Sequence, residues 1–265
     1  MRVHLTLLGC LPCLLAAPLL AQNIGGGTCA PAILTGTYSL DLSGRDLSSA
    51  VAYANVLQGI GTVTFDGVSA VTLTFTNNTN KAFGLPETWA GTYTMGSDCL
   101  GTVTITTGDT ASFVLGAFNV NGSYVSAAYF MNGQDGTYTI HGDGNLVPAT
   151  CSASTLSGTY AFNGNGWGLN STKAITGTNS ASGLLVFDGV SAVTGTWYIA
   201  SGGVFNVVSI TGTYTVTAAC AVTATVVDKA SNNYSVVFTI TGSNGAFIVS
   251  ASETKLMFSA TGRPL

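Results

Sequence analysis

Apolar and polar residues alternate along most of this chain. From Leu34 to Leu42 every second residue is apolar or glycine, and Thr, Ser and Asp stand between them. A period of two predicts a β-strand with one buried face. Turn-forming pairs such as Gly108-Asp109 and Asn121-Gly122 separate later segments of the same kind. The pattern therefore predicts short strands joined by tight turns.

The expected strands form two series with no alternation of strand and helix. They lie at about 34–42, 60–65, 70–77, 89–96, 100–107, 111–119, 123–131 and 136–141, and at about 156–163, 183–187, 192–199, 204–217, 220–228, 233–241, 246–252 and 255–261. About eight strands per series predict an all-β protein with two tandem antiparallel β-barrel (or sandwich) domains.

The two series are copies of one another. Residues 65–72 read Phe-Asp-Gly-Val-Ser-Ala-Val-Thr, and the same octapeptide returns at 187–194, a spacing of 122. Gly-Thr-Tyr motifs at 36–38 and 91–93 also return, at 158–160 and 212–214. A repeat of this length indicates duplication of a whole domain. We expect one barrel repeat at 22–146 and the second at 147–265, after a signal peptide at 1–21.

The repeated octapeptide predicts a hairpin, because Asp-Gly between alternating segments favours a tight turn. Val63 and Phe65 before the turn belong on the same face as Val71 after it. A loop of three or five residues places them together, whereas a shift of one residue would invert every side chain.

Repeat two differs from repeat one on the opposite face of this hairpin. Leu184 and Val186 stand where repeat one has Thr62 and Thr64. A strand that is apolar on both faces is usually covered on both sides. We therefore expect a repeat–repeat or partner contact through Leu184 and Val186.

Three stretches fit the strand pattern less well. Residues 45–57 offer either a helix capped by Asp46 or a loop followed by a strand, and the matching segment 169–183 favours the loop and strand. Residues 142–150, with Gly142, Gly144 and Pro148, are expected to link the repeats. Residues 262–265 are expected to form a frayed end.

Alternation alone also fits an outer-membrane β-barrel, in which the outward residues are Leu, Val and aromatic and the chain ends on a strand. Here the alternate positions are mostly Thr and Ser, and the expected end is frayed. Both observations weigh against that class. No apolar run after the first 21 residues reaches the length of a transmembrane helix.

Residues 1–21 have the order of a secretory signal peptide, with Arg2, an apolar stretch to Leu20 and small residues before Gln22. The run Leu7-Leu8-Gly9-Cys10 resembles a lipoprotein cleavage box, but apolar residues continue after it. The sequence predicts a protein that is secreted, or that lies in the periplasm or at the cell surface, after cleavage.

Four cysteines remain beyond the signal peptide, two in each repeat: Cys29, Cys99, Cys151 and Cys220. Four cysteines allow three pairings. The duplication favours Cys29–Cys99 and Cys151–Cys220, because each ancestral copy then closes its own bridge. Export makes disulfides more plausible than buried free thiols.

Charge excludes some partners. Charged residues make up 7% of the chain and the formal net charge is −4. No basic cluster is present, so neither nucleic acid nor an anionic membrane is an expected partner. Abundant Val, Phe, Tyr and Thr argue against disorder, and the surface must be built mainly from Thr, Ser, Asn and Gly.

The run Leu34-Thr35-Gly36-Thr37-Tyr38 after Cys29 resembles the first strand of calycin barrels, where lipocalins and avidins carry Trp in place of Tyr38. A Gly-x-Tyr strand, Phe-Asp-Gly, and then Gly91-Thr92-Tyr93-Thr94 with Cys99-Leu100-Gly101-Thr102 are more similar to exported bacterial β-barrel repeat proteins. The resemblance implies a small closed barrel of the lipocalin or allene-oxide-cyclase kind. It implies no catalytic residues.

The sequence contains little that points to catalysis. His141 is the one histidine beyond the signal peptide, and Asp135, His141 and Asp143 form the only loose grouping of polar ionisable residues. Asp66 and Asp188 are better explained as turn formers than as paired glycosidase carboxylates. We assign no catalytic residue, metal ligand or cofactor, and an enzyme remains the weaker alternative.

Aromatic residues on the inferred inward faces are the one candidate for ligand binding. They are Tyr38, Phe65, Phe75, Trp89, Tyr160, Phe187 and Trp197. Side chains can fill an eight-stranded barrel, so core packing is the simpler interpretation.

Two functional classes remain. One is a non-catalytic surface or extracellular module with a structural or interaction role. The other is a calycin-like binder of a small apolar ligand, with a cyclase- or isomerase-like enzyme as its extension. Filled interiors favour the first, and an apolar pocket of roughly several hundred Å³ favours the second.

Overall fold

The computed structural model describes residues 29–46, 56–79, 85–120, 123–172, 174–201, 203–242, 246–253 and 256–265. At 119–120, 123–128, 246–253 and 256 it describes the backbone alone. The expected signal peptide at 1–21 lies outside the described residues, as does most of the ambiguous stretch 45–57.

The described chain is all β apart from two short 3₁₀ turns, η1 (Pro31–Ile33) and η2 (Ala153–Thr155). The first repeat contains β1 (Thr35–Asp46), β2 (Val56–Asp66), β3 (Ala70–Thr79), β4 (Leu85–Met95), β5 (Leu100–Thr107), β6 (Ala111–Val120), β7 (Ser123–Gln134) and β8 (Tyr138–Asn145). The second contains β9 (Ser157–Leu169), β10 (Ile175–Asp188), β11 (Ala192–Ser201), β12 (Val204–Val216), β13 (Ala221–Asp228), β14 (Asn233–Thr241), β15 (Ala246–Glu253) and β16 (Leu256–Pro264).

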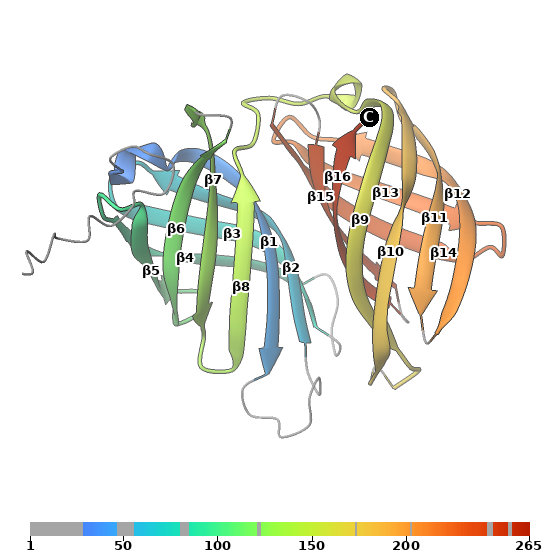
Figure 1. Ribbon diagram of the computed structural model, residues 1–265, viewed down its shortest axis with the longest axis horizontal. Coiled ribbons are helices and arrows are strands. Elements are labelled where there is room, and N and C mark those ends of the chain that lie inside the picture. The colour runs from blue at the N-terminus through green and yellow to red at the C-terminus, as the bar shows by residue number, and fades with distance from the viewer. Residues whose placement is uncertain are drawn as a thin grey trace, which may run out of the picture.

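Each repeat closes into an antiparallel barrel in which sequential strands are neighbours. Barrel one is β1 to β8, closed by the pairing of β1 with β8, and barrel two is β9 to β16, closed by β16 with β9. The two barrels stand side by side, with β1 and β2 of barrel one nearest to barrel two (Figure 1). The prediction of two eight-stranded β-domains is confirmed, and both are barrels rather than sandwiches.

The repeated octapeptide forms the β2–β3 hairpin with the expected odd loop. Phe65 pairs with Val71 and Val63 with Leu73, so their side chains share the inward face. Asp66 Oδ1 accepts hydrogen bonds from the backbone N–H groups of Val68, Ser69 and Ala70 at 2.8, 2.8 and 2.9 Å. These bonds lower the pKa of Asp66, and Gly67 takes the left-handed φ of 80° that the turn requires.

The second octapeptide repeats this turn. Asp188 Oδ1 accepts from Val190, Ser191 and Ala192 at the same distances of 2.8, 2.8 and 2.9 Å. Asp66 and Asp188 are therefore turn formers, as the sequence indicates, because their carboxylates are occupied by their own loops.

Strand β1 continues to Asp46 and β2 begins at Val56, while residues 47–55 of the ambiguous stretch lie outside the described residues. Two sequence expectations need correction. Strand β8 continues to Asn145, so the first part of the expected linker 142–150 belongs to barrel one. Residues 262–264 do not fray, because Gly262, Arg263 and Pro264 pair with β9 and close barrel two.

The Gly-Thr-Tyr motifs attach the 3₁₀ turn to the end of each barrel. In barrel one, Tyr38 donates its hydroxyl to the carbonyl of Ile33 at 3.3 Å and Tyr93 donates to that of Pro31 at 2.9 Å. In barrel two, Tyr214 donates to Leu156 at 3.2 Å. Burial raises the pKa of Tyr38 and of Tyr93 to about 12, so both hydroxyls remain donors at neutral pH. The recurring tyrosines thus have a structural role.

The motif glycines are needed for two reasons. Gly36 and Gly158 have φ values of 114° and 106°, which side-chain-bearing residues rarely adopt. Gly91 and Gly212 instead allow a close strand approach, because a Cβ there would collide with the carbonyl oxygens of Thr104 and Thr225.

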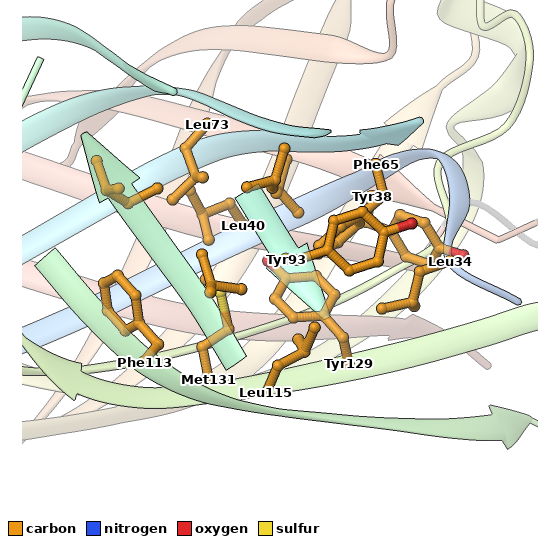
Figure 2. Packing of buried hydrophobic residues seen from close by; sticks show 14 of the residues in the cluster. Leu34, Tyr38, Leu40, Phe65, Leu73, Tyr93, Phe113, Leu115, Tyr129 and Met131 are labelled. Carbon is orange, nitrogen blue, oxygen red and sulfur yellow. The ribbon is translucent and has the colours of Figure 1, made fainter. Parts of the chain in front are cut away.

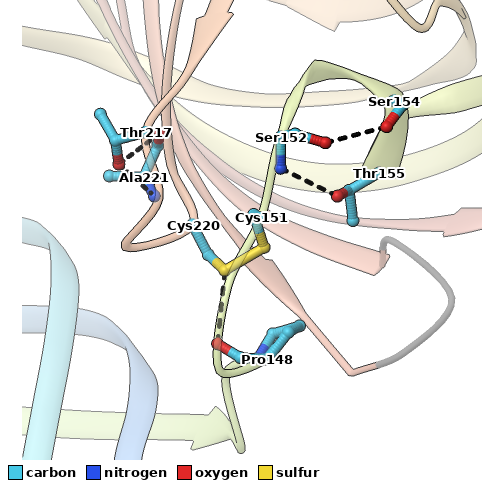
Figure 3. Close-up of a disulfide and its surroundings, with 8 residues drawn as sticks. All are labelled: Pro148, Cys151, Ser152, Ser154, Thr155, Thr217, Cys220 and Ala221. Carbon is cyan, nitrogen blue, oxygen red and sulfur yellow. Dashed lines mark hydrogen bonds between the residues drawn. A yellow bond between two sulfur atoms is a disulfide. The ribbon is translucent and has the colours of Figure 1, made fainter.

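One disulfide lies at the same end of each barrel. Cys29 is bonded to Cys99 and Cys151 to Cys220, as the duplication predicts. Each bond ties the segment before the 3₁₀ turn to a hairpin of its own barrel, shown for Cys151–Cys220 in Figure 3. Cys220 Sγ also lies 3.5 Å from the carbonyl oxygen of Pro148 in the link between barrels.

Candidate functional site

The seven aromatic candidates all lie inside the barrels. Tyr38, Phe65, Phe75 and Trp89 are buried in barrel one, and Tyr160, Phe187 and Trp197 in barrel two. In barrel one they pack edge to face, with ring centroids 5.0 Å apart for Phe75–Trp89 and 5.7 Å for Tyr38–Phe65. Leucine, methionine and further aromatic side chains belong to the same core as Tyr38 and Phe65 (Figure 2). The seven candidates act as core residues, which the sequence gives as their simpler interpretation.

Barrel two contains a small apolar cavity. Its volume is about 30 Å³, and its walls include Phe162, Leu185, Phe187, Trp197 and Phe238. Pockets that bind small organic ligands measure about 300–1,000 Å³. The cavity is thus roughly ten times too small for the apolar ligand that the calycin alternative requires.

A much larger groove lies between the barrels. Its volume is about 490 Å³, and its walls come from β1, β2, β7 and β8 on one side and from β9 and β16 on the other. The lining residues are Asp41, Ser43, Gly44, Arg45, Leu57, Gln58, Asn132, Gly133, Thr139, Ile140, His141, Asn165, Trp167 and Ser259. We call this the inter-barrel groove.

An ionisable cluster forms one wall of the inter-barrel groove. His141 Nδ1 lies 2.8 Å from Asn132 Oδ1, and His141 Nε2 lies 3.5 Å from the carboxylate of Asp143. The hydrogen bond and charge of Asp143, with the charge of Asp41, raise the pKa of His141 against the opposing effect of burial.

Asp41 lies beside this pair, because β1 and β8 align Asp41 with Asp143. Burial of the carboxyl group, reinforced by the charge of Asp143 and opposed by that of His141, raises the pKa of Asp41 to about 7. Asp41 is therefore partly protonated at neutral pH. The sequence singled out His141 and Asp143 as a loose grouping but missed Asp41, which lies about a hundred positions away.

The cluster has the parts of a proton-binding site, and among the described residues no hydroxyl or thiol is hydrogen-bonded to His141. The partners of His141 among the described residues are an amide and a carboxylate. The described residues also contain no group of three or more His, Cys, Asp or Glu that could hold a metal ion. The arrangement can exchange protons and form polar contacts, but it does not resemble a hydrolytic triad.

The groove also contains an aromatic ring on barrel two and a buried amide on β2 of barrel one. The guanidinium of Arg45 lies 5.7 Å from the ring centroid of Trp167, across the boundary between the barrels. Gln58 is 3% exposed, and its Oε1 has no hydrogen-bond partner among the described residues.

The barrels contact each other through β2, not through Leu184 and Val186. Ile60, on the outer face of β2, belongs to the hydrophobic cluster of barrel two, and Val56 packs with Leu169 and Met257. Leu184 and Val186 are 42% and 43% exposed, so the prediction of a repeat–repeat contact there is wrong. The strand that is covered on both faces is instead β2 of repeat one, whose outer face carries Val56, Gln58 and Ile60. The corresponding residues of repeat two are Thr178, Ser180 and Ser182.

Leu184 and Val186 belong to an exposed apolar face on barrel two. Its other members, on β11 and β12, are Tyr198, Phe205 and Val207. The rings of Tyr198 and Phe205 stack with centroids 6.0 Å apart. The outward neighbours Ser182, Thr194, Thr196, Ala200, Ser209 and Thr211 are all uncharged.

No protein-family model and no curated protein matches the sequence. Among solved structures, a crystal structure of isotype 1 transferrin binding protein B from serogroup B Neisseria meningitidis is similar to this chain at a TM-score of 0.29 and 8% identity. The similarity covers 87% of this chain and 76% of the other. The described part of this chain has no helix that is long and apolar enough to span a membrane.

Proposed function

We propose that this protein is an exported, non-catalytic interaction module that binds a macromolecular partner, at the cell surface or outside the cell, through the apolar face of barrel two. The apolar face consists of Leu184, Val186, Tyr198, Phe205 and Val207. No cofactor takes part in this function.

The exposure of this face is the observation that carries the proposal. Phe205 is 65% exposed and Val207 59%, on a barrel whose other outward positions are mostly Thr and Ser. Contiguous exposed apolar residues on a soluble protein commonly mark a binding surface, and aromatic residues are enriched at the centres of interfaces. The corresponding positions of repeat one include Thr62, Thr64 and Thr76, so the duplication has preserved the barrel while altering this face.

The barrel interiors support an interaction role over ligand binding. Their aromatic side chains pack against one another, and the cavity of barrel two holds about 30 Å³. The sequential eight-stranded order is that of lipocalins, which supports the calycin resemblance as a likeness of fold alone.

The disulfides support an extracytoplasmic location. Two intra-barrel bonds, Cys29–Cys99 and Cys151–Cys220, persist in an oxidising compartment such as the periplasm or the extracellular space. Together with the secretory pattern of residues 1–21, they favour export of the chain.

Site-specific photocrosslinking in the native host tests the proposal. A benzoylphenylalanine residue at Phe205 is expected to give a discrete crosslinked adduct, and one at the exposed Thr104 of barrel one is expected to give none. Excess unlabelled protein should abolish the adduct. The variant with Leu184→Thr, Val186→Thr and Tyr198→Thr, which restores the repeat-one residues, should fail to compete.

Absence of an adduct at Phe205, or equal competition by the triple variant, would overturn the proposal. Circular dichroism of the variant serves as the folding control, because Thr is well suited to exposed strand positions.

A further inference from the structure

The inter-barrel groove is a second candidate site, distinct from the apolar face. Its volume of about 490 Å³ lies within the range of small-molecule pockets. Both barrels contribute walls, so the site exists only when the two repeats pack together. Cavities between domains are a common location for ligand sites.

Gln58 provides an independent indication of a ligand. It lines the groove, is 3% exposed, and its Oε1 lacks a donor among the described residues. A buried amide oxygen without a partner is unfavourable, so such groups are rare in folded proteins. A ligand hydroxyl in the groove would supply the missing donor. Its repeat-two counterpart, Ser180, is exposed, so the buried amide is particular to repeat one.

The charges around the groove disfavour an ionic ligand. Arg45 and His141 line it together with Asp41, and Asp143 lies beside His141. An anion would meet the two carboxyl groups, and a cation would meet the guanidinium and the imidazole. A neutral molecule meets no net repulsion from this mixture.

The remaining polar groups can both donate and accept hydrogen bonds. Ser43, Asn132, Asn165 and Ser259 present hydroxyls and amides from both barrels. The partly protonated carboxyl of Asp41 adds a group of the same dual character. Several such groups around one cavity suit a ligand that carries many hydroxyls.

Trp167 adds an apolar wall. Its indole packs beside Val56, Leu169 and Met257 and carries the Arg45 guanidinium at 5.7 Å. Aromatic rings flanked by planar polar side chains suit a molecule with an apolar C–H face and a polar edge.

We propose that the inter-barrel groove binds a small neutral saccharide, held by hydrogen bonds to Gln58 and Asn132 and by contact with Trp167. The ring hydroxyls of a saccharide match the mixed donors and acceptors, and its C–H face matches the indole. The proposal does not depend on the apolar face.

Tryptophan fluorescence of the full chain offers a direct test. The other two tryptophans, Trp89 and Trp197, are buried inside the barrels, so Trp167 is the one that lines the groove. The protein would be titrated with glucose, galactose, mannose, N-acetylglucosamine, lactose and cellobiose at millimolar concentrations. At least one of these is expected to cause a saturable change, which Trp167→Phe should abolish.

Two further variants test the polar contacts. Gln58→Leu is expected to weaken binding about tenfold or more while leaving the melting temperature unchanged or higher, because it replaces an unpaired buried oxygen with an apolar group. Ser259→Ala probes the opposite wall and should also weaken binding. Val114→Thr, at an exposed position of β6 outside the groove, is the control and should bind as the wild type does.

The proposal is overturned if none of these saccharides gives a saturable change. It is also overturned if the change persists undiminished in Trp167→Phe or in Gln58→Leu. A stronger response to acetate or methylammonium than to the saccharides would show that the groove selects an ion and would equally overturn it.

Discussion

The hydroxyl of Thr239 in barrel two donates a hydrogen bond of 3.3 Å to the carbonyl oxygen of Gly61 in barrel one. Beside this bond, Ile60 is 2% exposed and packs into the hydrophobic cluster of barrel two. The outer face of β2 is therefore an interface between the repeats, although β2 already contributes its inner face to the core of barrel one.

Replacing Ile60 should weaken this interface. Ile60→Thr is expected to lower the free energy of unfolding by about 2 kcal/mol, because an apolar side chain leaves the interface while β-propensity is kept. Leu184→Thr makes the corresponding change at an exposed position and should alter stability by less than about 0.5 kcal/mol. Urea denaturation measures both, and equal effects would contradict the assigned interface.

The two repeats are also expected to behave as separate folding domains. Each barrel is closed by its own strands and has its own core cluster and disulfide. Fragments 22–146 and 147–265 should each unfold cooperatively, and the first should be less stable than in the full chain because it exposes Val56 and Ile60. Calorimetry of both fragments tests the boundary, and two fragments without a cooperative transition would contradict it.

Local patterns predicted the barrels because each determining contact lies within one repeat. The alternation of Val63, Phe65 and Val71 determines that their side chains point into the barrel, and the octapeptide defines the odd-numbered loop between the strands. The last strand was expected at about 255–261, and its continuation to Pro264 was missed because Gly262 and Pro264 are poor strand formers, whose propensity is overridden by pairing with β9. A closed barrel requires this last strand, since otherwise β9 would have an open edge.

The inter-barrel groove could not be predicted in the same way. Asp41, His141 and Trp167 come together only when β1 pairs with β8 and the two barrels pack side by side. One signal was nevertheless present: Val56 and Ile60 alternate with the inward Leu57 and differ from Thr178 and Ser182 of repeat two. The rule that a strand apolar on both faces is covered on both sides therefore predicted a contact between the repeats correctly. It was applied to Leu184 and Val186 of repeat two, whereas the contact lies on β2 of repeat one.

Loss of either disulfide should destabilise the barrel that contains it. The bonds Cys29–Cys99 and Cys151–Cys220 close loops of 70 and 69 residues. Replacing one pair by alanine is expected to cost about 2–5 kcal/mol, chiefly because the unfolded chain gains freedom. Thermal unfolding should show the loss, and peptide mapping without reduction checks the pairing. A cross-repeat peptide such as Cys29–Cys151 would contradict the pairing.

The pH dependence of stability should reveal the proton on Asp41. Its pKa is raised to about 7 in the folded protein, whereas the unfolded carboxyl titrates near its usual value of about 4. Between these two values the folded state binds more protons than the unfolded state, so stability falls as pH rises from about 4 to about 7. The raised pKa of His141 acts in the same direction, because its contribution to stability is present at low pH and is lost as pH rises through that pKa.

Melting temperatures from pH 5 to pH 8 should therefore decline in the wild type and decline less in Asp41→Asn, which should be the more stable of the two at pH 8. His141→Gln, which keeps Asp41, should retain most of the decline. Parallel curves for the wild type and Asp41→Asn would show that Asp41 ionises normally in the folded protein.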